Sequence, residues 1–159
     1  METMVLAGVI PFITYCLSSA WGMGNPFHVR GRVYCDTCQC GFETQKTTYI
    51  SGATVRVECR DRTDLQLRYS LEGVTDSAGA YKIKVVGDQA DRICHVVLVD
   101  SPLADCKIAH PVRNRAEVIL TRSNGAISDL HYANSLGFVK DEALPGCAEL
   151  VKKLLESDE

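Results

Sequence analysis

Ala53-Thr-Val-Arg-Val-Glu-Cys-Arg60 carries the clearest strand pattern in the sequence. Every second residue in it is alanine, valine or cysteine, and the residues between them are polar or charged. Successive side chains of a β-strand point to opposite faces of a sheet, so this pattern predicts a strand with one buried and one solvated face. The pattern places Cys59 on the buried face.

The same alternation recurs along most of the chain. Further strand candidates are residues 27–35, 65–71, 81–85, 93–99 and 116–121. Turn-forming residues separate them, among them Thr75–Gly79 and Ser101-Pro102. Six or seven short strands of this kind predict an all-β fold, either an antiparallel sandwich or a small barrel. The one predicted helix begins after Pro145-Gly146, because Cys147 and the leucines that follow recur at helical spacing.

The amino-terminal residues predict a secretory signal peptide. Met4–Leu17 is uncharged and mainly apolar, and small residues follow it. As a helix this run would rise ~21 Å, short of the ~30 Å hydrocarbon core of a membrane. A signal peptide over residues 1–22, cleaved after Ala20 or Gly22, fits better than a buried helix. We therefore expect secretion to the extracellular space, with a β domain over residues 23–146 and a helix with an acidic tail over 147–159.

Charge and composition exclude several classes of partner. The net charge is −3 and the isoelectric point about 5.8, so nothing indicates binding to nucleic acid or to an anionic membrane. After the amino-terminal run there is no second apolar stretch, so we expect no membrane span in the mature chain. The 159 residues, of which 46% are hydrophobic, suit one globular domain.

Eight cysteines are the unusual feature of the composition. Seven remain once the signal peptide removes Cys16, and two of them form the C-x-x-C pair Cys35 and Cys38. Zinc would need a second such pair or suitably spaced histidines, and thioredoxin-type exchange would need the pair to open a helix. Neither context is present. Pairing of each cysteine with a distant one, as in a secreted disulfide framework, is the favoured interpretation.

Catalytic motifs are missing from the sequence. There is no Gly-x-Ser-x-Gly, and no glycine-rich phosphate loop stands between a strand and a helix. The turn Thr75–Tyr81 has too few oxygen ligands for calcium. No Asn-x-Ser/Thr sequon occurs. We expect no catalytic residues, no cofactor, no metal site and no N-glycosylation.

A family resemblance enters with Gly31-Arg-Val-Tyr-Cys-Asp-Thr-Cys38. This segment is very similar to the signature of the Ole e I-like pollen proteins. The similarity covers nearly all of the mature chain and is closest to the cereal pollen-specific members around Asn114–Arg122. The signature residues are Gly31, Val33, Tyr34, Cys35, Asp36, Thr37 and Cys38.

The resemblance implies a seven-stranded β-barrel or sandwich with three disulfides and no catalytic activity. It also implies a secreted protein of pollen, in a family linked to pollen hydration, tube growth and receptor-kinase signalling. The implied bridges are Cys35–Cys106, Cys38–Cys147 and Cys59–Cys94, which leave Cys40 as an unpaired thiol. Two residues depart from the family pattern: Gln39 replaces the usual arginine, and Arg30 replaces the usual Glu, Gln or Thr.

The sequence therefore favours a non-enzymatic extracellular protein. Its partner would be another extracellular protein, such as a receptor kinase, or a component of the cell wall. Two alternatives stay open. One is a thiol-disulfide active protein that uses the cluster Cys35, Cys38 and Cys40. The other is a wall-polysaccharide binding module, which would need an exposed aromatic platform. The candidates for that platform are Tyr34, Tyr49, Tyr69 and Tyr132.

Overall fold

The computed structural model describes residues 24–122, 125 and 128–158, and these contain ten strands and one helix. The predicted signal peptide and Cys16 lie outside them. The strands are β1 (Phe27–Asp36), β2 (Thr48–Tyr49), β3 (Thr54–Asp61), β4 (Leu67–Val74), β5 (Ala80–Val85), β6 (Arg92–Asp100), β7 (Ile108–Ala109), β8 (Arg115–Val118), β9 (Leu130–Tyr132) and β10 (Leu136–Val139). The helix is α1 (Cys147–Glu156).

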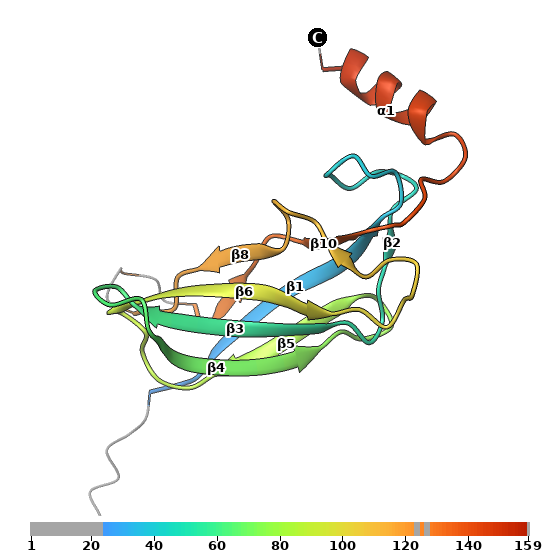
Figure 1. Cartoon of the computed structure of the whole chain (residues 1–159). Helices are drawn as coiled ribbons and strands as arrows, with labels where there is room; N and C mark the ends of the chain where they lie inside the picture. Colours follow the sequence, from blue (N-terminus) through green and yellow to red (C-terminus); the bar gives the residue numbers. More distant parts are fainter. Residues whose placement is uncertain (1–23, 123–124, 126–127, 159) are drawn as a thin grey trace, which may run out of the picture.

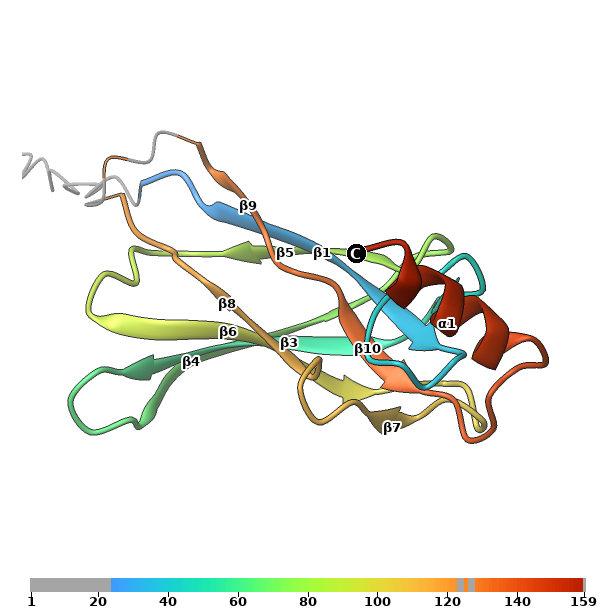
Figure 2. The same ribbon diagram turned by 90° about the horizontal axis from the view of Figure 1, so that it is seen from above.

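The first sheet is organised around the long strand β1 (Figure 2). Residues 27–32 of β1 pair antiparallel with β5, and residues 28–30 pair in parallel with β9. Farther along, residues 33–36 pair in parallel with β10, and residues 34–35 pair antiparallel with β2. β7 completes this sheet beyond β10. One strand therefore connects segments from both ends of the described chain.

The second sheet is antiparallel, with strand order β4-β3-β6-β8 (Figure 1). Its strand β3 contains nearly all of the alternating segment Ala53–Arg60. Val55, Val57 and Cys59 of β3 are 0% exposed, and they lie in one apolar core with Val29 and Val33 of β1. Burial of such side chains is worth about 1.5–3 kcal/mol each, which makes this inter-sheet core the main source of stability.

The fold expectation is correct in class and wrong in detail. The protein is mostly β with two sheets, but the described residues form ten strands where seven were expected, and the sheets are not closed, so the barrel is wrong. The first sheet is also not purely antiparallel, because β9 and β10 run parallel to β1. These strands come more than 90 residues after β1, and no short hairpin dictates their direction. Sequence alternation alone carries no information on such long-range pairing.

The strand predicted over 65–71 is also corrected. Leu65 lies in the turn before β4, with a left-handed φ of 57°. Leu71 is directly opposite Val57 of β3, yet it is 41% exposed. Leu67 is 45% exposed and is opposite Arg60, because an irregularity between Cys59 and Arg60 shifts the register. β4 is the edge strand of its sheet, so part of its apolar face extends past the strands that cover the core. The alternation of apolar residues indicates on which face of the sheet a side chain lies. Whether that side chain is buried depends on whether the other sheet covers that part of the face.

The helix α1 begins after Gly146, whose φ of 81° suits glycine, and it projects away from the two sheets (Figure 1). Cys147 is its one buried residue. The helix was predicted in the same place from its spacing of leucines. Within the described residues, no helix has the length and apolar character needed to cross a membrane.

Candidate functional site

Three disulfides connect the described cysteines. Cys59 and Cys94 face each other directly across β3 and β6, with their Cα atoms 4.0 Å apart, and both are buried. The other two bridges lie at the end of β1. Cys35 binds Cys106 in the β6–β7 connection, and Cys38 binds Cys147 at the start of α1. These six cysteines are the ones that the family resemblance pairs.

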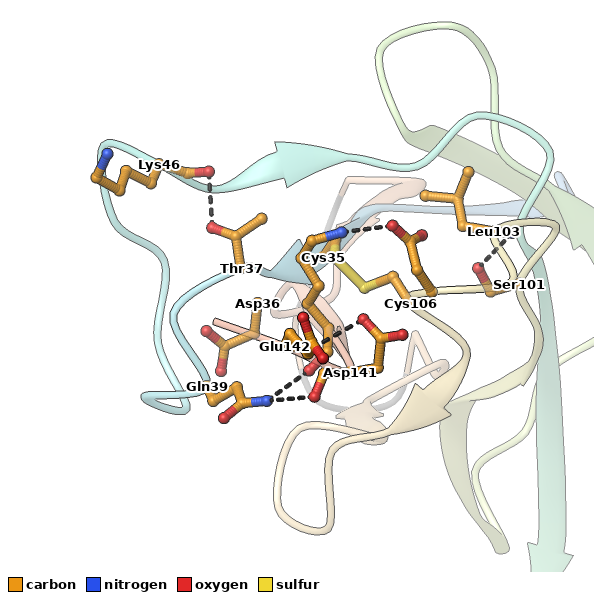
Figure 3. The surroundings of a disulfide bond; sticks show 12 residues. Cys35, Asp36, Thr37, Gln39, Lys46, Ser101, Leu103, Cys106, Asp141 and Glu142 are labelled. Carbon is orange, nitrogen blue, oxygen red and sulfur yellow. Dashed lines mark hydrogen bonds and ion pairs between the residues drawn. A yellow bond between two sulfur atoms is a disulfide. The ribbon is translucent and has the colours of Figure 1, made fainter. Parts of the chain in front are cut away.

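The loop after β1 is also tied to the chain near residue 140 (Figure 3). Gln39 donates two hydrogen bonds from Nε2, to the carbonyl oxygens of Lys140 at 2.8 Å and Asp141 at 3.1 Å. Thr37 donates its hydroxyl to the carbonyl of Lys46 at 2.7 Å. Gln39, which departs from the family pattern, thus joins the loop after β1 to the residues that follow β10 through its amide.

Asp36 organises the same loop from inside. It is 1% exposed, and its two carboxylate oxygens accept hydrogen bonds from the backbone N–H groups of Cys40 at 3.2 Å and Gly41 at 2.7 Å. A buried carboxylate needs such donors, because burying it without them would cost several kcal/mol. The signature aspartate is therefore a structural residue that shapes the turn.

Cys40 is the one free cysteine among the described residues, and it is half-buried. Its Sγ lies 3.3 Å from the carbonyl oxygen of Phe42 and 3.6 Å from Oδ1 of Asp36. Burial raises the pKa of the Cys40 thiol above its ordinary value, and the negative charge of Asp36 raises it further. A reactive cysteine needs the opposite environment, one that favours the thiolate.

We expect slow alkylation of Cys40 at neutral pH. The pKa of the thiol is raised, so the thiolate fraction stays small at pH 7 and grows only at more alkaline pH than for an unperturbed thiol. Iodoacetamide labelling followed by mass spectrometry should give a rate profile shifted to higher pH than that of N-acetylcysteine. A profile shifted to lower pH would contradict this and revive the thiol-active alternative.

Two signature residues make close packing possible. Gly31 lies against the side chain of Tyr81. A Cβ added at position 31 would lie 2.2 Å from the Tyr81 hydroxyl oxygen, so no larger residue fits there without displacing the ring. The ring of Tyr34 covers Gly137 of β10 in the same way, since a Cβ added at position 137 would lie 2.6 Å from Cζ of Tyr34. Burial raises the pKa of Tyr34 to about 12, so its hydroxyl stays neutral. Gly31 and Tyr34 therefore act in packing β1 against its neighbours.

The described residues bring together no catalytic group that we recognise. No cluster of three or more His, Cys, Asp or Glu side chains among them could hold a metal ion. His28 lies on β1 and His95 on β6, in different sheets. Cys35 and Cys38, the C-x-x-C pair, are each bonded to a distant cysteine and not to each other.

The four aromatic candidates lie in different environments. Tyr34 is 2% exposed and Tyr69 is half-buried, so neither offers a platform. Tyr49 is 37% exposed, but the Arg32 guanidinium carbon lies 3.4 Å from the centre of its ring. Tyr132 on β9 is 73% exposed. Tyr132 is thus the most accessible of these rings.

Tyr132 is directly opposite Arg30 of β1 and borders a group of basic residues. We call this group the basic face; it consists of His28, Arg30 and Arg32 of β1 and Lys82 and Lys84 of β5. Alternation placed these residues on the polar faces of two separate strands. The sequence could not show that the two strands are neighbours, which is what gathers the charges on one surface.

The comparisons with known proteins agree with one another. The sequence profile of the family described as "Pollen protein Ole e 1 like" matches residues 25–155. "Protein DOWNSTREAM OF FLC" from Arabidopsis thaliana is 53% identical over 86% of this chain and 84% of its own. "Pollen-specific protein C13" from Zea mays is 47% identical over 82% of this chain and 77% of its own.

A solved structure supports the same assignment. The crystal structure of the major plantain pollen allergen Pla l 1 superimposes with a TM-score of 0.71 and 29% identity, over 77% of this chain and 99% of the allergen. The resemblance carried by Gly31–Cys38 is therefore confirmed in sequence and in fold. The chain belongs to the Ole e 1-like family of pollen proteins.

Proposed function

We propose that this pollen-type protein is secreted and acts outside the cell as a non-enzymatic binding protein. The observation that carries the proposal is the set of three disulfides: one joins β3 to β6, one joins β1 to the β6–β7 connection, and one joins the loop after β1 to α1. Structural disulfides persist in oxidising compartments and are rare in the cytosol. The apolar run Met4–Leu17 is the matching export signal in the sequence.

The chemistry of the cysteines supports the non-enzymatic part of the proposal. Redox exchange needs a reducible vicinal pair or an accessible thiolate. Here Cys35 and Cys38 are committed to distant partners, and burial raises the pKa of the Cys40 thiol. The protein therefore acts by binding. Its partner is an extracellular protein, such as a receptor kinase, or a component of the cell wall.

Secretion is tested by expressing the full chain in plant cells. We expect the protein in the medium, beginning at Trp21 or Met23, with one thiol per chain on titration without reductant. A variant lacking residues 4–17 serves as the control and should stay inside the cell. A product that retains Met1 and remains cytosolic would overturn the proposal. Two additional thiols that appear under mild reduction, from one labile disulfide, would favour the thiol-active alternative.

A further inference from the structure

The basic face arises from the register of two strands. Arg30 is directly opposite Lys82, and His28 is directly opposite Lys84. Neighbouring strands lie about 4.8 Å apart, and alternate residues of a strand lie about 6.8 Å apart. The residues between them, Val29 and Ile83 among others, are buried. Arg30, Lys82 and Lys84 are therefore close to one another, and their exposed side chains lie on the face that points away from the core.

Few carboxylates compensate this charge. Within residues 24–122, 125 and 128–158, no ion pair includes Arg30, Lys82 or Lys84. Asp76 lies beside the face, but its Oδ1 already accepts hydrogen bonds from the N–H groups of Ala78 and Ala80. The whole chain carries a net charge of −3, so this cluster is a local excess against the overall charge.

The surface at the basic face is hollowed. A hollow of about 740 Å³ is lined by Arg30, Arg32, Lys82 and Tyr132, among others. A second hollow of about 480 Å³ adjoins the first, because Ala133 and Ser135 line both. Arg113 and Glu43 also line it, and the Glu43 carboxylate accepts a hydrogen bond from the Tyr49 hydroxyl at 2.6 Å. Cations thus occur along two connected hollows, with the exposed ring of Tyr132 beside them.

We propose that the basic face and the adjoining hollows bind an acidic polysaccharide whose sugars carry carboxylates. This inference rests on the proposed extracellular function and names the partner class. Guanidinium and ammonium groups complement the regularly spaced carboxylates of such a chain. Tyr132 can stack on the apolar face of a sugar ring, a contact that an acidic peptide does not require. The two adjoining hollows, of about 740 Å³ and 480 Å³, suit a chain of linked sugars better than a single small ligand.

The test measures binding of an unesterified oligogalacturonate of defined length to the mature protein. The buffer contains EDTA, which prevents calcium from bridging the sugars. We expect binding that weakens between about 0.01 M and about 0.15 M ionic strength, because solvent-exposed charges are screened by salt. The fully methyl-esterified oligomer and a neutral cello-oligosaccharide should not bind.

Two variants locate the site. Arg30→Gln with Lys82→Gln should weaken binding by about tenfold, since it removes two facing cations. Lys152→Gln with Lys153→Gln is the matched control, which removes the same charge from α1 and should leave binding unchanged. Tyr132→Ala should weaken binding of the oligogalacturonate and leave binding of a polyglutamate peptide unaffected.

Three outcomes would overturn the inference: no binding of the oligogalacturonate, equal losses in the two double variants, or no effect of Tyr132→Ala. The last result together with tight polyglutamate binding would indicate an acidic protein partner instead. The amino-terminal sequence and the thiol count of the same preparation report separately on the proposed function. Failure of this inference is therefore distinguishable from failure of secretion.

Discussion

The Cys59→Ala/Cys94→Ala variant should unfold roughly 10–15 °C below the wild type. The bridge closes a loop with a sequence separation of 35, and loop entropy assigns such a cross-link about 4 kcal/mol of stability. For a domain of this size 1 kcal/mol corresponds to about 3–4 °C. The two alanines also leave a void in the core, where Cys59 and Cys94 are 0% and 2% exposed.

Thermal unfolding followed by circular dichroism measures this effect. Cys40→Ala is the matched control, since it removes a cysteine that forms no bridge, and its midpoint should stay close to that of the wild type. If the double variant melted together with the control, the bridge between β3 and β6 would contribute nothing beyond the packing of the sheets.

Gly79→Ala is expected to cost about 3 kcal/mol or more of unfolding free energy. Gly79 has a φ of 71°, which disfavours any residue with a Cβ by about 1–2 kcal/mol. The added Cβ would also lie 2.8 Å from the carbonyl oxygen of Val33 and 2.7 Å from Cβ of Tyr49. This carbonyl oxygen accepts a hydrogen bond from the backbone N–H of Ile50, so it cannot move aside without breaking the contact between β1 and the residue that follows β2.

Gly87→Ala separates the two causes of this loss. Gly87 has a similar φ of 87°, but the atom nearest to its added Cβ is 3.8 Å away, in the side chain of Gln89. It should lose only the conformational part, about 1–2 kcal/mol. Urea unfolding of both variants gives the difference directly. Equal losses at the two positions would show that the close contact at Gly79 relaxes at no cost.

The strands that could be predicted are those with a buried and a solvated face. β3, β5 and β6 follow the alternation closely, because each lies against the core on one side. β10 could not be found this way, since Leu136, Gly137 and Phe138 are all buried and do not alternate. β2 and β7 have two residues each, too few for any periodicity.

In the candidate site, too, some features could be predicted from the sequence and others could not. The cysteines and the signature Gly31–Cys38 are visible as residues, and the structure gives them local, structural roles at the end of β1. The basic face, in contrast, results from the register in which β1 pairs with β5. Arg30 and Lys82 are 52 positions apart in the sequence, and only the antiparallel pairing of β1 with β5 makes them neighbours.

The pairing of β1 also sets the order in which the protein can fold. During synthesis β1 is the first strand made, yet its partners β9 and β10 are among the last. The sheet β4-β3-β6-β8 comes from residues 54–118, so it can assemble earlier. Until residue 139 is available, one edge of β1 lacks its native partners. Contacts of such long sequence separation slow folding, and the exposed edge is the part of the nascent chain most prone to wrong association.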